Sequence, residues 1–249
     1  MTKTALITGG AKRIGKAIAL GLAQKGWQIA IHYGHSAQAA DELVATLNAQ
    51  NAKAVALQAD LADAQQVETL LPRANETLGR VELLVNNASV FERDTATDFT
   101  TDTWDTHLNV NLRAPALLMR DFAGQTSAGN IINIIDQRVW RLTPDFSSYT
   151  VSKTGLWSLT QTFAQALAEQ NIRVNGIGPG PTLPNPRQDQ AEFDKQTRLV
   201  PLGHGASPEE VADAVMYILS ANSMTGQMIA LDGGQHLAWK TPDVTEVVE

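Results

Sequence analysis

Short apolar runs alternate along the chain with longer segments in which apolar residues recur every three or four positions. The runs are typical of strands buried on both faces, and the periodic segments are typical of helices that cover a sheet. The segments that we expect to be strands are 4–8, 27–33, 54–58, 83–86, 131–135, 173–177 and 227–231. The segments that we expect to be helical are 16–25, 65–78, 103–122, about 147–168 and 207–219.

Strands that alternate with helices predict an α/β fold. We expect a parallel, doubly wound sheet of about seven strands in the order 3-2-1-4-5-6-7, with helices on both faces and right-handed crossovers. Nothing in the chain resembles a linker, so residues 1–249 are interpreted as one domain. The polar segment 241–249 is expected to be a loose tail.

Composition narrows the range of partners. A net charge of -7 argues against a nucleic acid or an anionic membrane, because both need a basic face. The chain has no cysteine, and its five histidines lack carboxylates at ligand spacing, so no metal site is expected. The start of the chain lacks a signal peptide and no apolar stretch reaches membrane-spanning length, which indicates a cytoplasmic protein that binds a small molecule.

The first apolar run opens directly into a glycine-rich turn, GGAKRIG, and a helical segment follows. Gly9 permits the tight turn, and Gly15 permits close packing of the helix start on the strand. Exposed N–H groups at that helix start, with the positive end of its dipole, suit a pyrophosphate. Strand, glycine turn and helix together predict a Rossmann-like dinucleotide site.

The tip of the second strand indicates which dinucleotide binds. It reads Gly34, His35, Ser36, and the first acid is Asp41, inside the following helix. A carboxylate at the tip would repel a 2′-phosphate, whereas histidine and serine can donate to it, so we expect NADPH. Because histidine is largely neutral at pH 7, the grip of His35 on the phosphate should weaken as the pH rises.

A candidate for proton transfer lies at 136–153. Tyr149 and Lys153 are four residues apart and share one helix face, where the ammonium would lower the pKa of the phenol. Asp136 follows the apolar run 131–135, at the carboxyl end of a strand, where such sheets bind ligands. A tuned tyrosine in this place can give a proton to a substrate near neutral pH.

Together, TGGAKRIG, NNAS at 86–89 and Tyr149-x-x-x-Lys153 resemble the short-chain dehydrogenase/reductase family over nearly the whole chain. The resemblance implies an NADP-binding homotetramer, in which Asn111 (favoured over the nearby Asn109) holds a water on the proton path to Lys153. It implies a lid at 184–206. It also implies cofactor contacts from Gly9, Lys12, Arg13, Ile14, Gly15, Tyr33, His35, Ser36, Asp60, Leu61, Asn87, Ala88, Ser89, Tyr149, Lys153, Pro179, Gly180, Thr182 and Leu183. Asp60 could instead cap the helix that follows it, as could Asp63.

Three positions resemble the pteridine reductase branch of the family. Arg13 replaces the usual middle glycine of the turn and is implied to lie near the cofactor phosphates and the substrate. Asp136 replaces the usual serine, and Phe91 matches the aromatic residue that stacks on a pterin ring. For Arg13 the alternative is a solvated residue, and for Phe91 it is a loop side chain that fills a lid. The substrate contacts implied are Arg13, Ser89, Phe91, Asp136 and Tyr149.

The function expected is hydride transfer from NADPH to a C=N bond of a pterin, from dihydropterin to tetrahydropterin. The catalytic set would be Asn111, Asp136, Tyr149 and Lys153, with proton delivery by Asp136 and Tyr149. One alternative is reduction of a ketone or a 3-oxoacyl thioester, with Asp136 as a neutral donor. A second alternative is a non-catalytic regulator that binds NADPH, which would not need a tuned phenol.

Overall fold

The computed structural model describes residues 3–185 and 187–239, and the predicted tail at 241–249 lies outside them. Seven parallel strands form one sheet in the order β3-β2-β1-β4-β5-β6-β7, which confirms the predicted topology. The strands are β1 (Thr4–Ile7), β2 (Gln28–Tyr33), β3 (Ala54–Gln58), β4 (Val81–Asn86), β5 (Gly129–Ile134), β6 (Ile172–Pro179) and β7 (Met228–Leu231). The helices are α1 (Arg13–Gln24), α2 (Ala37–Ala49), α3 (Ala64–Leu78), α4 (Thr101–Leu108), α5 (Ala114–Gln125), α6 (Ser147–Ala166), α7 (Gln190–Arg198) and α8 (Pro208–Ser220).

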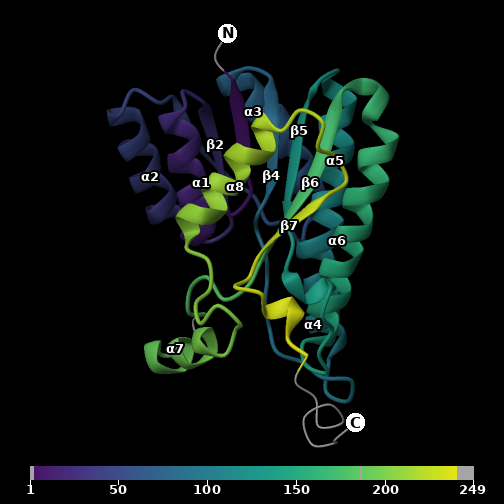
Figure 1. The fold of residues 1–249 in the computed structure, drawn as a ribbon. Coiled ribbons are helices and arrows are strands. Elements are labelled where there is room, and N and C mark those ends of the chain that lie inside the picture. Colours follow the sequence, from purple (N-terminus) through teal and green to yellow (C-terminus); the bar gives the residue numbers. More distant parts are fainter. Residues whose placement is uncertain (1–2, 186, 240–249) are drawn as a thin grey trace, which may run out of the picture.

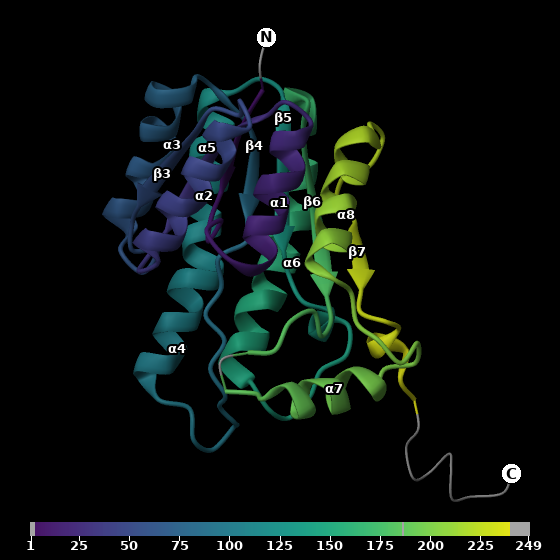
Figure 2. The same ribbon diagram turned by 90° about the vertical axis from the view of Figure 1, so that its left-hand side faces the viewer.

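The helices cover both faces of the sheet, so the core has two layers (Figures 1 and 2). Alternate strand side chains point to opposite faces. In β1, Leu6 packs with side chains of α3, α5 and α6, whereas Ala5 and Ile7 pack with those of α1, α2 and α8. A strand buried on both faces reads as a continuous apolar run, and this is why the strands were visible in the sequence.

The predicted single helix 103–122 contains an irregular turn. It runs as α4, a π-helical turn η1 (Asn109–Arg113) and α5. Pro115 lies at the start of α5 and has no N–H, so it cannot donate the bond that an α-helix would direct to the carbonyl of Asn111. The wider turn accommodates this missing bond, and such turns are frequent at functional sites.

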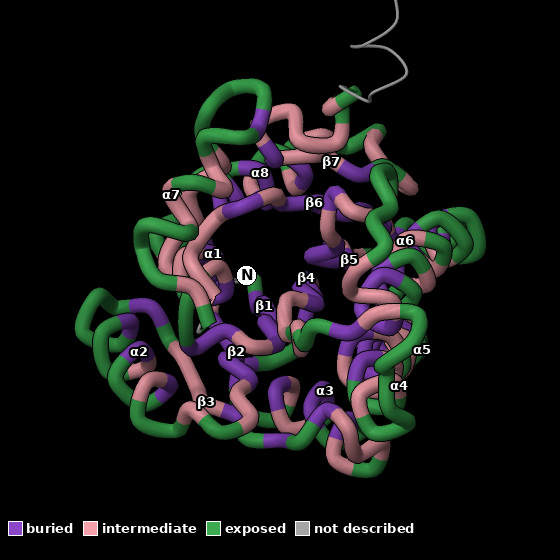
Figure 3. Tube along the Cα trace, turned by 90° about the horizontal axis from the view of Figure 1, so that it is seen from below, coloured by how far each residue is buried: buried purple, intermediate pink, exposed green. Residues whose placement is uncertain are grey.

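The carboxyl ends of the strands form the edge where a ligand is expected. β1 and β4 are neighbours, so the strand order reverses between them, and open α/β sheets bind ligands at such a switch point. Figure 3 looks onto this edge, and α7 lies on the side of α1 and α2. Short 3₁₀ turns complete the edge: η2 (Gln137–Val139) after β5 and η4 (Gln235–Leu237) after β7, while η3 (Ala168–Gln170) precedes β6.

Candidate functional site

Gly9 and Gly15 of the glycine-rich turn occupy positions that leave no room for a side chain. A Cβ added to Gly15 would lie 2.4 Å from the carbonyl oxygen of Gly9 and 2.6 Å from Nδ2 of Asn87. Gly9 has a φ of 61°, in the left-handed region that favours glycine. Both roles predicted for these glycines, the tight turn and the close approach of the helix, are therefore observed.

Side chains from the segments that directly follow β1 and β4 tie the turn to the switch point. The hydroxyl oxygen of Thr8 accepts hydrogen bonds from the backbone N–H groups of Asn87 (2.9 Å) and Ala88 (3.1 Å). The amide of Asn87 donates to the carbonyls of Thr8 (2.9 Å) and Gly9 (3.1 Å). These bonds fix the two ends of the switch point relative to each other.

A buried histidine that the sequence analysis did not single out supports the same turn. His32, at the end of β2, accepts the N–H of Gly9 at Nδ1 (3.1 Å), so Nε2 carries the proton and donates to the carbonyl of Ala59 (3.1 Å). Burial lowers the pKa of His32 from 6.5 to about 4. The neutral imidazole thus joins β1, β2 and the segment after β3 around the predicted nucleotide position.

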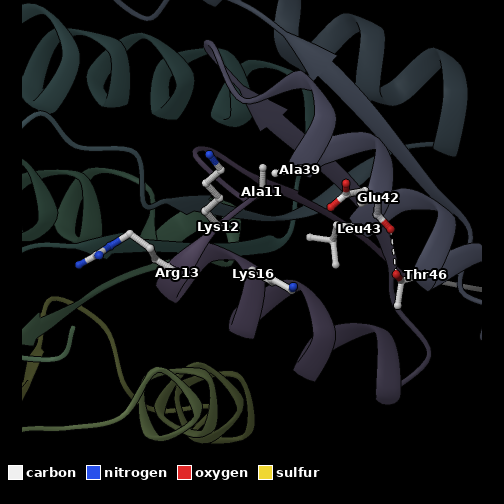
Figure 4. Close-up of a pocket in the computed structure, with 8 residues that line it drawn as sticks. All are labelled: Ala11, Lys12, Arg13, Lys16, Ala39, Glu42, Leu43 and Thr46. Atoms are coloured by element: carbon white, nitrogen blue, oxygen red, sulfur yellow. Dashed lines mark hydrogen bonds between the residues drawn. The ribbon is translucent and has the colours of Figure 1, made fainter. Parts of the chain in front are cut away.

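A cavity of about 450 Å³ lies beside the turn, between α1 and α2 (Figure 4). Lys12, Arg13 and Lys16 contribute the basic groups of its lining, and Glu42 is the acidic group. In Figure 4 the side chain of Arg13 points away from Glu42. Arg13 has a φ of 54°, which is unusual for a residue with a side chain. This conformation fits the position, which the resemblance assigned to a glycine.

The tip of β2 is free of acid, as predicted. His35 is exposed, and Ser36 precedes α2 without a side-chain capping bond, so its hydroxyl is available to a ligand. Asp60 does not cap α3, which was the alternative to a cofactor contact, because Asp63 does so. Asp63 caps α3 by accepting the N–H groups of Gln65 and Gln66. Asp60 is exposed, and among the described residues its carboxylate accepts only from the N–H of Ala62. Leu61 is buried behind it.

Asp136 and Tyr149 form a hydrogen-bonded pair at the end of β5. The phenol of Tyr149 donates to Oδ2 of Asp136 (2.8 Å), and Oδ1 accepts the N–H of Arg138 (2.7 Å). The second bond orients the carboxyl group, because it makes Asp136 the N-cap of η2. Tyr149 is buried and Asp136 is half-buried, so the pair lies at the boundary between core and surface.

Lys153 is fully buried beside the pair, but it does not act as the sequence analysis expected. Its Nζ donates to the carbonyl of Ile134 (2.9 Å) and lies 5.7 Å from the centre of the Tyr149 ring. Burial, followed by the charge and hydrogen bond of Asp136, raises the pKa of Tyr149 well above 10. The net shift is therefore opposite to the lowering that was expected, because desolvation and the nearby carboxylate dominate it. Burial lowers the pKa of Lys153 itself to about 8.

Asn111 lies in the π-helical turn η1 and is fully buried. Its side chain accepts the N–H of Val90 (2.8 Å) and donates to the carbonyl of Val90 (2.9 Å) and to Oγ of Ser152 (3.2 Å). The side chain therefore anchors the segment after β4 to α6. Pro115 has no N–H to donate to the backbone carbonyl of Asn111.

An aromatic wall faces the pair. Phe91 stacks on Phe146 with ring centroids 4.5 Å apart and an interplanar angle of 10°. It meets the ring of Tyr149 edge-on, at 4.7 Å and 75°. The guanidinium of Arg138 lies 4.7 Å from the centre of the Phe146 ring. Phe91 thus belongs to a packed wall beside the phenol, and Ser89 is exposed at the start of the same segment.

The segment after β6 connects the two sides of the edge. Gly180 follows Pro179 and donates its N–H to the carbonyl of Leu231 (2.9 Å). The hydroxyl of Thr182 donates to the carbonyl of Gly180 (3.2 Å). Arg13, from the glycine turn, donates to the carbonyls of Leu183 (3.2 Å) and Pro184 (2.7 Å).

The predicted lid contains α7, which begins with a capping box formed by Asp189 and Glu192. Just before it, Arg187 pairs with Glu92 and donates to the carbonyl of Phe91 (2.6 Å). The lid segment therefore contacts the wall of the site, and the sequence analysis did not anticipate this arginine. An ion pair between residues about 95 positions apart leaves no local signal in the sequence.

The catalytic candidates Asp136, Tyr149 and Lys153 therefore lie together, with Asn111 behind them. Several of the predicted cofactor contacts lie on the other side of the switch point, on or beside β2, β3 and α1. They are Lys12, Ile14, Tyr33, His35, Ser36 and Asp60. Among the described residues, no group of three His, Asp or Glu side chains is arranged to hold a metal, and no helix is long and apolar enough to cross a bilayer.

Comparison with known proteins identifies relatives over nearly the whole chain. Residues 9–236 match the family described as enoyl-(acyl carrier protein) reductase. FolM alternative dihydrofolate reductase 1 from Brucella canis, solved in complex with NADP, is 45% identical with a TM-score of 0.94, over 98% of this chain and 97% of that chain. A blue fluorescent protein from a metagenomic library, solved with NADPH, is 32% identical with a TM-score of 0.88, over 94% and 97%. The 3-oxoacyl-[acyl-carrier-protein] reductase of Synechocystis sp. is 30% identical over 93% of this chain and 96% of that protein.

Proposed function

The chain belongs to the short-chain dehydrogenase/reductase family, and we propose that it uses NADPH to reduce a C=N bond of a pterin. The proposed reaction takes a dihydropterin to its tetrahydro form. At the coarser level the chain is an NADP-dependent oxidoreductase of this family.

The residues on the β1–β3 side fit NADPH. The glycine turn is too close-packed for side chains, so backbone can approach a pyrophosphate, and its basic neighbours are Lys12, Arg13 and Lys16. At the tip of β2, His35 and the hydroxyl of Ser36 could donate to a 2′-phosphate. This hydroxyl makes no capping hydrogen bond to α2. Bound NADPH supplies the hydride, and the protein supplies orientation and the proton.

The hydrogen bond between Tyr149 and Asp136 carries the assignment to pterins. In a ketone reductase, an ionised carboxylate at this place would face a developing alkoxide and oppose the reaction. Reduction of a C=N bond differs, because hydride adds to the carbon and the ring nitrogen must receive a proton. A group that holds a proton at this place would therefore favour the reaction. The phenol of Tyr149 is protonated near pH 7, and its hydrogen bond to Asp136 means that the pair holds one proton, which would pass to the ring nitrogen.

Other residues would position the reactants. Phe91, beside the phenol, offers a ring on which a flat heteroaromatic substrate can stack. Lys153 would hold the ribose of the cofactor and supply protons, since its pKa of about 8 lies near the working pH. The carbonyl of Asn111 would keep a water on the path that returns protons to Lys153.

Relatives support both the proposal and its main alternative. The dihydrofolate reductase named above is 45% identical, and its name indicates a reduced pterin ring in the substrate. The 3-oxoacyl relative, at 30% identity, is the reason to keep reduction of a ketone or thioester as the second candidate. In that case Asp136 would have to be protonated and act as a neutral donor.

The test is a substrate panel in which loss of NADPH absorbance is followed with 7,8-dihydropterins, simple ketones and a 3-oxoacyl thioester. Turnover of dihydropterins alone is the expected result. Turnover of ketones or the thioester alone would replace the proposal with the general reductase activity. Binding of NADPH without turnover of any of them would indicate a regulator.

We also propose that the enzyme is cytoplasmic, and that it is a homotetramer, as the family resemblance implies. Light scattering of the purified protein tests the assembly, with a mass of four chains expected. A monomer in solution would overturn this part of the proposal and leave the activity unaffected.

A further inference from the structure

Three buried polar side chains lie beside the catalytic pair without taking part in it. Asp94 follows β4, His107 is on α4, and Ser148 is in the first turn of α6. They are 3%, 0% and 0% exposed. Polar groups are costly to bury unless they are hydrogen-bonded, so a cluster of three requires an explanation.

The three side chains form one chain of hydrogen bonds with a single direction. The backbone N–H of Glu92 donates to Nε2 of His107 (3.1 Å), so the neutral ring carries its proton on Nδ1. Nδ1 therefore donates to Oγ of Ser148 (2.6 Å), and that hydroxyl donates to the carboxylate of Asp94. The backbone N–H of Ser148 also reaches both oxygens of Asp94 (3.3 Å each).

Each part of this chain is next to the aromatic wall or to the phenol. Glu92 follows Phe91 directly, and Ser148 precedes Tyr149 directly. The backbone carbonyl of Asp94 accepts the N–H of Phe146 (2.6 Å), the residue on which Phe91 stacks. The ring of His107 lies 5.9 Å from that of Tyr149, at 72°.

We propose that Asp94, His107 and Ser148 are positioning residues that hold Phe91 against Tyr149 and so set how tightly the substrate ring binds. This inference rests on the proposed function, because the wall that they hold is the one expected to stack on the pterin. The three residues do not touch the reacting atoms. They fix the distance between the wall and the proton donor.

The network depends on a neutral His107. The charged and titratable groups around its ring are Asp94 and Glu92 from the segment after β4, and Tyr149 and Lys153 from α6. Burial, the largest effect, lowers the pKa of His107 below 6.5, although Asp94 and Glu92 raise it. Protonation at acid pH would remove the acceptor for the N–H of Glu92, so the KM of the substrate should rise there.

The experiment compares His107→Phe, His107→Gln and Ser148→Ala with the wild type and with Thr106→Ala, a control at an exposed residue of the same helix. Phenylalanine removes both hydrogen bonds, glutamine can accept and donate in place of the ring, and Ser148→Ala breaks the chain with little change of volume. Each variant is measured for substrate KM, kcat, NADPH affinity and hydrogen–deuterium exchange of residues 90–94.

For His107→Phe and Ser148→Ala we expect faster exchange at 90–94 and a KM raised about tenfold, because buried groups lose their partners. NADPH affinity and the control should be unchanged, and kcat should change less than KM. His107→Gln should retain a KM near that of the wild type at pH 7 and lose the rise of KM at acid pH.

Wild-type KM and exchange in both His107→Phe and Ser148→Ala would overturn the inference. If the wild type reduces a ketone and no pterin, the proposed function fails, and the same KM comparison is made with that ketone. If no substrate is turned over, exchange at 90–94 decides. Unchanged exchange in the variants then overturns the inference. Faster exchange supports the proposal that the three residues hold Phe91 against Tyr149.

Discussion

The two sides of the ligand edge are built differently. On the cofactor side, the glycine turn is close-packed. The side chains of Thr8, His32 and Asn87 support it through hydrogen bonds to backbone groups. On the substrate side, the key contacts join one side chain to another, such as Tyr149 with Asp136 and Arg187 with Glu92. The cofactor side is thus built into the fold, whereas the substrate side can change by single substitutions without altering the sheet.

The largest effect should come from breaking the substrate side alone. Tyr149→Phe removes the proton donor but keeps the ring that meets Phe91 edge-on. Turnover should fall by about 10²–10⁴-fold, the usual contribution of a general acid. NADPH affinity, measured by fluorescence titration, should stay within a few-fold of wild type, and loss of NADPH binding would contradict the separation of the two sides.

The cofactor side should respond to pH through His32. The pKa of this residue is 6.5 in the unfolded chain and about 4 in the folded one, so the folded state resists protonation. The stability that depends on neutral His32 is therefore present above pH 6.5, falls as the pH drops, and is lost below about 4. The difference in pKa corresponds to about 3 kcal/mol in the free energy of unfolding.

Urea denaturation between pH 7 and 4 measures this loss, and His32→Gln is the comparison because glutamine does not titrate. The variant should be less stable than the wild type at pH 7 and show a shallower fall at acid pH. Parallel pH profiles for the two proteins would mean that His32 is not responsible.

A smaller effect is expected from closing the space at the glycine turn. Gly15→Ala places a Cβ 2.4 Å from the carbonyl oxygen of Gly9, so backbone must shift, at a cost of about 1–3 kcal/mol in stability. NADPH affinity should fall with it. Gly21→Ala, on the same helix, is the matched control, since its Cβ would meet only Ala212 at 3.5 Å and Met216 at 4.0 Å.

Gly21→Ala should be neutral or stabilising by about 0.5–1 kcal/mol, because alanine favours the helix. Thermal unfolding and NADPH titration of both variants provide the measurement. Equal behaviour of the two would show that the turn tolerates side chains.

The smallest effect should follow Arg187→Ala in the lid segment. Its partner Glu92 is 58% exposed, and exposed ion pairs contribute about 0–1 kcal/mol. We expect KM to rise a few-fold, unchanged thermal stability and unchanged NADPH affinity. Steady-state kinetics at low and high salt measures this, and a large loss of stability would mean that the segment is part of the core.

The sequence predicted all seven strands, because strands buried on both faces are continuous apolar runs. Their order followed from the doubly wound topology expected when strands alternate with helices. It also predicted which glycines form the turn, since Gly9 and Gly15 are needed for local geometry. It missed the support given to that turn by His32, which depends on a neighbour 23 residues away in the chain. The π-helical turn was missed as well, although Pro115 in NLRAP is a signal that could have indicated it.

On the substrate side the sequence identified Asp136, Tyr149 and Lys153 but not their electrostatics. Spacing along a helix placed Lys153 near the phenol, yet spacing does not report burial or the carboxylate that the fold brings to the same hydroxyl. The network of Asp94, His107 and Ser148 joins three segments that are far apart in sequence. Such contacts become visible only once the chain is folded.

The most direct test of the proposed activity is the turnover of a dihydropterin by Asp136→Ser, compared with wild type at equal NADPH saturation. Serine provides a hydroxyl that can bond to Tyr149, and it is the residue usual at this position in the family. We expect dihydropterin reduction to fall by at least about 100-fold while NADPH affinity stays near the wild-type value. Turnover within a few-fold of wild type would contradict the role of the Asp136–Tyr149 pair in proton delivery.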